Sequence, residues 1–255
     1  MEREEVFRKI LDLYGKMPEN FNILQNQIDL SVQVEYFEYS RRVKKKLNPE
    51  EIITNKERLF LPGITKREKK FLLAKLASVE DVSAFRTIEK YTQSVDNEEL
   101  KDWAALAYLE SKMFLESTFL NESQVFISTG LGGKGSKLRY FVVITSKSGS
   151  YFSDIQKKII KSEFEFSLGK NNSELEEISF SDSFATLLVL IPLNIPINDV
   201  FETAVKECNE FGNFLTDDFI VTNVKAMTNQ EIVKFLEEHK NDVSDKTKSI
   251  ELNDE

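Results

Sequence analysis

A run of glycines near the middle of the sequence is the feature most suggestive of chemistry. Four of the nine glycines of the chain fall within six residues, in the segment Thr129–Lys137. Flexible backbone of this kind can surround a phosphate with N–H groups, and several cations lie beside it. We therefore predict a loop that binds an anion or a partner, with the residues Gly130, Gly132, Gly133, Lys134, Gly135, Ser136, Lys137 and Arg139. The alternative is a hairpin loop without a ligand.

The glycine spacing matches the dinucleotide pattern G-x-G-x-x-G at Gly130, Gly132 and Gly135, but that motif requires a helix directly after the loop. The apolar segment 138–145 follows instead and predicts a strand. A phosphate-binding Walker loop would end in Gly-Lys-Ser/Thr, whereas this chain reads Gly135-Ser136-Lys137. The sequence therefore predicts no cofactor. So many glycines exceed the need of a hairpin turn, which indicates either mobility or the close approach of another backbone.

Positive charge is concentrated in one stretch of an otherwise acidic chain, whose net charge is −9. Residues 41–70 contain 11 Lys or Arg and four Glu. Such a stretch can form a surface for an acidic partner, or it can be a solvated helix end whose cations complement the helix dipole. The candidate residues of this basic surface are Arg41, Arg42, Lys44, Lys45, Lys46, Lys66 and Arg67.

Several catalytic classes are disfavoured by composition. With one cysteine and one histidine, the chain cannot assemble a Cys/His metal cluster, and a Ser-His-Asp triad would depend on His239 near the end of the chain. Cys208 is flanked by Glu207 and Glu210, which predicts a buried and unreactive thiol. We therefore predict no metal site and no enzymatic activity.

The first half of the sequence has helical periodicity. An apolar stripe covers residues 6–17, and a second, with spacings of three and four, predicts one long helix from Phe21 to Leu47. Further helices are predicted over 66–77, 79–93 and 97–120. Ser78 with Asp81, and Asp96 with Glu99, have the spacing of capping boxes before the last two.

Two segments in this half, Leu72–Lys90 and Glu98–Ala107, place an acidic turn before a helix, and the second contains Trp103-Ala-Ala-Leu-Ala107. On these residues the segment 66–120 resembles HEAT-type helical repeat units. The resemblance implies stacked helix pairs of the kind that bind proteins or nucleic acids. A plain helical bundle is the alternative.

The second half has the pattern of an α+β domain. Strands are predicted at 124–127 and 138–145 on either side of the glycine run, with the partner of the first left open. A helix at 152–168, strands at 174–180 and 184–191, a helix at 198–211 and a strand at 219–227 follow. This β-α-β-β-α-β order predicts a ferredoxin-like antiparallel sheet, with the two most apolar runs, 138–145 and 184–191, at its centre. Thr228 and Glu231 form a capping box before a last helix.

The sequence thus predicts an all-helical domain over residues 1–120, a ferredoxin-like α+β domain over 121–240 and a disordered acidic tail over 241–255. The predicted function is a non-catalytic, cytoplasmic binding or scaffold protein that engages a protein partner, without a membrane segment; a homodimer is left open. One alternative is a sensor of a small molecule or nucleotide-type anion through loop 130–139. Another is association with nucleic acid through the basic stretch 41–70.

Overall fold

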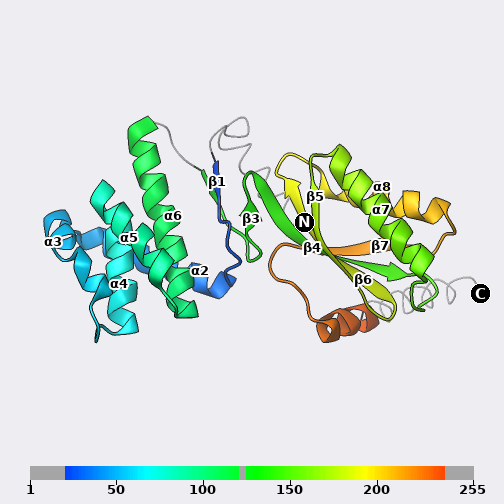
Figure 1. The fold of residues 1–255 in the computed structure, drawn as a ribbon, viewed down its shortest axis with the longest axis horizontal. Helices are drawn as coiled ribbons and strands as arrows, with labels where there is room; N and C mark the ends of the chain where they lie inside the picture. Colours follow the sequence, from blue (N-terminus) through cyan, green and yellow to red (C-terminus); the bar gives the residue numbers. More distant parts are fainter. Residues whose placement is uncertain (1–20, 121–124, 239–255) are drawn as a thin grey trace, which may run out of the picture. The chain divides into compact units, whose positions relative to one another are not determined.

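The computed structural model describes residues 21–120 and 125–238 and divides into two compact units, residues 1–138 (unit 1) and 139–255 (unit 2) (Figure 1). The division falls inside strand β4 (Lys137–Ser146), so the glycine run belongs to unit 1, whereas the sequence pattern placed it in the second domain. The apolar stripe at 6–17 and the predicted tail at 241–255 lie outside the described residues.

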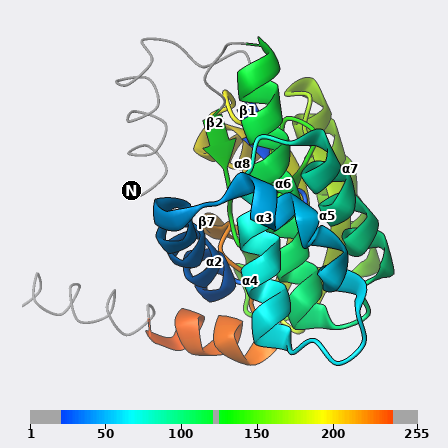
Figure 2. The same ribbon diagram turned by 90° about the vertical axis from the view of Figure 1, so that its left-hand side faces the viewer.

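Unit 1 is built from helices whose first turns are fixed by side-chain caps. Asp29, Asn48, Thr65 and Asp81 each accept a hydrogen bond from a backbone N–H of the first turn of the following helix. Asp81, predicted as the partner of a cap at Ser78, is itself the N-cap. The helices are α2 (Leu30–Val43), α3 (Pro49–Thr54), α4 (Lys66–Ala77), α5 (Val82–Ser94) and α6 (Glu98–Leu120), with short 3-10 helices η1 (Lys44–Lys46) and η2 (Lys56–Phe60) (Figures 1 and 2).

The predicted single helix over Phe21–Leu47 is wrong at its start. Phe21–Ile23 forms strand β1, which pairs in parallel with β2 (Val125–Ile127). Helix α2 begins only at Leu30, where the carboxylate of Asp29 caps it. Leu24 and Ile28 precede the helix but are buried in the same core as Tyr36. The helix-like spacing of apolar residues therefore extends ahead of α2, although residues 21–23 form a strand.

Aromatic side chains fill the core of unit 1. Trp103 is fully buried, and its ring meets those of Tyr36 and Tyr39 edge to face, with centroids 5.1 and 5.8 Å apart. Trp103 is therefore a core residue of unit 1. Because Tyr36 and Tyr39 belong to α2 and Trp103 to α6, these contacts fix α2 against α6.

Unit 2 combines helices with a mainly antiparallel sheet, so the α+β class is confirmed. It contains α7 (Asp154–Lys170), β5 (Glu174–Phe180), β6 (Phe184–Pro192), α8 (Ile197–Glu210) and β7 (Leu215–Thr222) (Figure 1). In the sheet β4 and β6 are neighbours, β5 pairs antiparallel with β6, and β7 pairs antiparallel with β4. The two apolar strands are therefore the inner ones, as predicted. Reciprocal hydrogen bonds between Thr228 and Glu231 confirm the last capping box.

No helix among residues 21–120 and 125–238 has the length and apolar character needed to cross a membrane.

The segment 124–127 does not form a hairpin with β4. Its described part, β2, pairs with β1 in a two-stranded sheet, and β4 instead pairs at its start with the short strand β3 (Gly133–Lys134). The glycine run therefore leads from the two-stranded sheet into a short hairpin, in which Gly133 belongs to β3 and Gly135 lies in the turn between β3 and β4.

Two glycines of the run are required by the close approach of other main-chain atoms. A Cβ on Gly132, whose φ is +65°, would lie 2.4 Å from the carbonyl oxygen of Asn26, and a Cβ on Gly133 would lie 2.2 Å from that of Lys137. Any larger residue would force these backbones apart. Of the two explanations offered by the sequence, close backbone approach applies at these positions.

We predict that Gly132→Ala destabilises unit 1 more than Gly135→Ala. Both glycines have left-handed φ values, +65° and +60°, but a Cβ at Gly135 meets nothing within 4 Å. The left-handed conformation costs alanine about 1–2 kcal/mol at either site, and overpacking adds about 1–3 kcal/mol at Gly132 alone. Denaturant unfolding followed by fluorescence of Trp103, the only tryptophan of the chain, measures the difference. Equal losses would show that the contact with Asn26 is unimportant.

Candidate functional site

The predicted anion-binding loop is tied down by bonds within unit 1. Residues Gly130–Gly133 are buried. The backbone N–H of Gly135 donates to Oε1 of Gln25 at 2.8 Å, and the Thr129 hydroxyl donates to the carbonyl oxygen of Gly132 at 3.2 Å. These bonds use groups that an anion would need. The structure thus accounts for Gly132 and Gly133 by packing, and the role of the loop as a binding site stays a prediction.

The cationic residues of this loop differ in exposure and in ion pairing. Lys134 and Ser136 are exposed and Lys137 is half-buried. Arg139 instead forms a two-pronged pair with Glu176 of β5, at 2.5 Å from Nε and 3.1 Å from Nη2. The guanidinium is therefore already bound to a carboxylate in unit 2.

The predicted basic surface is only partly a free cationic surface. Arg41, Lys45 and Arg67 are exposed, whereas Lys44 and Lys66 are bound by carboxylates of α6. Arg42 pairs with Glu38 one turn earlier on α2, at 3.9 Å, and nothing is described of the Lys46 side chain. Some of these cations therefore form ion pairs with helix α6 of unit 1, which the sequence pattern did not indicate.

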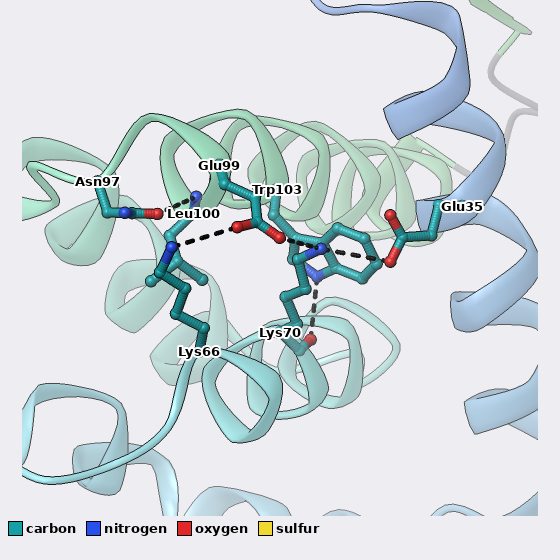
Figure 3. A network of polar contacts seen from close by, with 7 residues as sticks. All are labelled: Glu35, Lys66, Lys70, Asn97, Glu99, Leu100 and Trp103. Carbon is teal, nitrogen blue, oxygen red and sulfur yellow. Dashed lines mark hydrogen bonds and ion pairs between the residues drawn. The ribbon is translucent and has the colours of Figure 1, made fainter.

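Lys70 is the centre of the polar network in Figure 3. Its ammonium lies 2.8 Å from Glu99 of α6 and 3.3 Å from Glu35 of α2, and 4.4 Å from the centroid of the Trp103 ring. The indole N–H of Trp103 donates to the backbone carbonyl of Lys70 at 3.0 Å. Lys66 also reaches Glu99, at 3.4 Å (Figure 3). The network joins α2, α4 and α6.

The charges of this network shift one another's pKa. Burial alone would lower the pKa of Lys70, but the hydrogen bonds and charges of Glu99 and Glu35 outweigh it and raise that pKa. The hydrogen bond and charge of Lys70, followed by Lys66, lower the pKa of Glu99. The ions therefore remain charged through the neutral range.

A pocket of about 290 Å³ lies within unit 1, beside α2, α6 and β2. Its walls are mostly apolar or aromatic side chains, and one end carries the charged pair Lys44 and Glu110. The apolar lining residues are Phe37, Leu106, Leu109, Met113, Phe114 and Phe126. We call this the α6 pocket. Its volume is just below the range of roughly 300–1,000 Å³ typical of small-molecule sites.

The charged end of the α6 pocket is organised around the Glu110 carboxylate. Oε2 accepts a hydrogen bond from the Tyr36 hydroxyl at 2.5 Å, Oε1 accepts one from the Ser40 hydroxyl at 2.7 Å, and Nζ of Lys44 forms an ion pair with Oε1, also at 2.7 Å. Burial, then the neighbouring charge and hydrogen bond of Glu110, raises the pKa of Tyr36 well above 10.0. The phenol therefore remains a neutral donor, and three donors hold the carboxylate in place.

Sequence reasoning missed this cluster, although part of its signal was present. Tyr36, Ser40 and Lys44 follow one another at intervals of four, which places three donors along one side of α2. Their acceptor, Glu110, is about 70 residues away and has no distinguishing neighbours, so the sequence could not identify it.

Other candidate chemistry is weaker. A second pocket of about 290 Å³ beside α3, η2 and α4 is lined by Glu51, Arg58, Glu68 and Lys75 among others, so it has no single polar end.

Cys208 is buried, and burial followed by the charges of Glu163 and Glu207 raises the pKa of its thiol to about 12, which confirms the prediction of an unreactive thiol. Within the described part of the chain, no group of three or more His, Cys, Asp or Glu residues is placed to hold a metal ion.

No protein-family model matches the chain, and no curated protein matches it. The resemblance of residues 66–120 to HEAT-type repeats therefore stays a prediction. Among solved structures, the chain is similar to a protein from Deinococcus radiodurans R1 described as a "putative transposase", with 17% identity and a TM-score of 0.35. The match covers 42% of this chain and 93% of the other.

This finding corrects two predictions. The non-catalytic scaffold for a protein partner and the absence of enzymatic activity both conflict with a structural neighbour described as a "putative transposase", and both are withdrawn. The alternatives, an anion sensor at loop 130–139 and a nucleic-acid-associated protein, gain no support from the comparisons. At this identity and TM-score the likeness carries no argument about what this chain binds or does.

We predict that Glu99→Gln destabilises unit 1 at neutral pH and that this loss disappears in acid. Because the pKa of Glu99 is lowered in the folded state, its stabilising effect is present above its ordinary value of 4.5 and is lost as the pH falls through the lower folded value. Denaturant unfolding followed by Trp103 fluorescence, repeated between pH 7 and pH 3, measures this convergence.

Glu98→Gln is the matched control, because Glu98 is exposed and, among the residues that the structure describes, forms an ion pair only with Lys101 one turn away, at 3.7 Å. It should change the free energy of unfolding little at any pH. A constant difference between Glu99→Gln and the original chain across this range would exclude the coupling to Lys70.

Proposed function

We propose that unit 1 binds a small organic molecule with an apolar body in the α6 pocket. The observation that carries the proposal is the combination of aromatic and aliphatic walls with one fixed polar end, Lys44 and Glu110. Pockets of this composition gain affinity from apolar burial and take their specificity from a few fixed polar groups.

The supporting geometry is preorganised. Glu110 is only 11% exposed and is held by Tyr36 and Ser40, both of which are themselves buried. The rings of Phe37 on α2 and Phe126 on β2 are in contact, with their centroids 5.6 Å apart. Since these groups are positioned by core packing, a ligand would meet a formed site at little cost in ordering side chains.

Three further proposals concern the rest of the chain. The sheet order β5-β6-β4-β7, with α7 and α8 in the connections, supports a ferredoxin-like layout for unit 2. A buried free Cys208 supports a reducing compartment such as the cytoplasm. The exposed Arg41, Lys45 and Arg67 support a surface for an acidic partner, whether protein or nucleic acid.

We predict that hexan-1-ol produces a saturable shift of the Met113 methyl resonance. The chain has four methionines, of which Met113 lines the α6 pocket, so selective methyl labelling reports on the site against three internal references. The methyl chemical shifts of Met1, Met17 and Met227 should not follow the binding curve that Met113 shows as hexan-1-ol is added.

The variant Leu109→Phe fills the α6 pocket and should weaken this binding by about tenfold or more, a change of roughly 1.4 kcal/mol. Leu72→Phe, at an equally half-buried leucine lining the other pocket, is the matched control and should leave binding unchanged. Absence of a Met113 shift, or equal effects of the two variants, would refute the proposed site.

A further inference from the structure

Two lysines of unit 1 lie in closely similar surroundings. The Lys70 ammonium contacts a carboxylate of α6, Glu99, at 2.8 Å and lies 4.4 Å from the ring of Trp103, also on α6. The Lys44 ammonium contacts another carboxylate of α6, Glu110, at 2.7 Å and lies 5.2 Å from the ring of Phe114, again on α6. In both places one helix supplies an acid and an aromatic ring to a cation from elsewhere in the chain.

The two sites differ in their second carboxylate. Lys70 also binds Glu35, at 3.3 Å, and its side chain is 13% exposed. Within residues 21–120 and 125–238, Lys44 has a single carboxylate partner, Glu110, and its side chain is 39% exposed. An ammonium group has three N–H donors, so Lys44 retains donors where Lys70 has a second acid.

Glu110 offers little to a ligand by comparison. Its two oxygens already accept hydrogen bonds from Tyr36 and Ser40 and form an ion pair with Lys44, so these contacts occupy three of the roughly four lone-pair sites of the carboxylate. The binding capacity left at the polar end of the α6 pocket is therefore that of a cationic donor, and it selects an acceptor group.

Resting on the proposed function of the α6 pocket, we infer that its ligand is a small monocarboxylate with an apolar body. The ligand carboxylate takes the position on Lys44 that Glu35 takes on Lys70, so that one ammonium bridges two acids. Phe114 lies close to the same ammonium and lines the pocket, so the apolar body continues from the carboxylate along the aromatic wall. A ligand ammonium would instead be repelled by Lys44.

The test compares three probes of equal length: hexanoate, hexan-1-ol and hexylamine. Titration of the Met113 methyl resonance should give hexanoate about tenfold tighter binding than hexan-1-ol, since hydrogen bonds between charged groups are about twice as strong as neutral ones. Hexylamine should bind more weakly than either.

Variants of two consecutive lysines locate the effect. Lys44→Met should abolish the preference for hexanoate while hexan-1-ol still binds, and Lys44→Arg should retain it. Lys45→Met removes an exposed charge next in sequence and should change nothing. Unchanged Trp103 fluorescence checks that the variants remain folded.

The outcomes separate the two claims. Equal binding of hexanoate and hexan-1-ol, tighter binding of hexylamine, or a preference that survives in Lys44→Met would overturn the carboxylate inference and leave the pocket as a site for apolar molecules. Failure of all three probes to shift Met113 would overturn the proposed function as well.

Discussion

The half-buried ammonium group of Lys70 is a constraint on which the packing of unit 1 depends. Lys70 on α4 has lost most of its contact with water, and such a cation is tolerated only where acids and hydrogen bonds compensate for its lost hydration. Here the acids come from two other helices, Glu35 from α2 and Glu99 from α6. The backbone carbonyl of the same residue accepts the indole N–H of Trp103. Three helices from separate parts of the chain must therefore be in register before this charge is satisfied.

A related arrangement lies beside the α6 pocket, because α2 and the residue that follows it form ion pairs of opposite polarity, one with α4 and one with α6. Near its start α2 supplies an acid, Glu35, to the Lys70 network, and just beyond its end Lys44 supplies a cation to Glu110. Tyr36 lies between them, with its ring against Trp103 and its hydroxyl on Glu110. These contacts hold α2 against α4 and α6 beside the pocket that Phe37 lines.

Much of this architecture could be predicted from the sequence, because it depends on interactions between residues that are close together in the sequence. Apolar spacing identified α4, α5 and α6, although Asp81 and Asn97 cap the last two in place of the predicted Ser78 and Asp96, and continuous apolar runs identified β4 and β6 as inner strands. The predictions were wrong where contacts with residues far away in the sequence determine the structure. Phe21–Ile23 became a strand because β2, about 100 residues later, pairs with it. The basic stretch was interpreted as a surface because its acids, Glu99 and Glu110, are on a helix well beyond it. The Glu110 cluster could not be predicted for the same reason.

The glycine run, which first suggested chemistry, acts on the candidate site through the main chain. Gly132 packs against the backbone of Asn26, and Gln25 bonds to Gly135, so the run holds the segment that follows β1. Strand β1 in turn pairs with β2 and sets Asn22 opposite Phe126, the residue that completes the aromatic wall of the α6 pocket beside Phe37. The absence of side chains at Gly132 and Gly133 permits this close packing. The glycine run therefore helps to position one wall of the α6 pocket, while its role as a binding site stays a prediction, and the charge that would select a ligand at the pocket comes from Lys44, which directly follows α2.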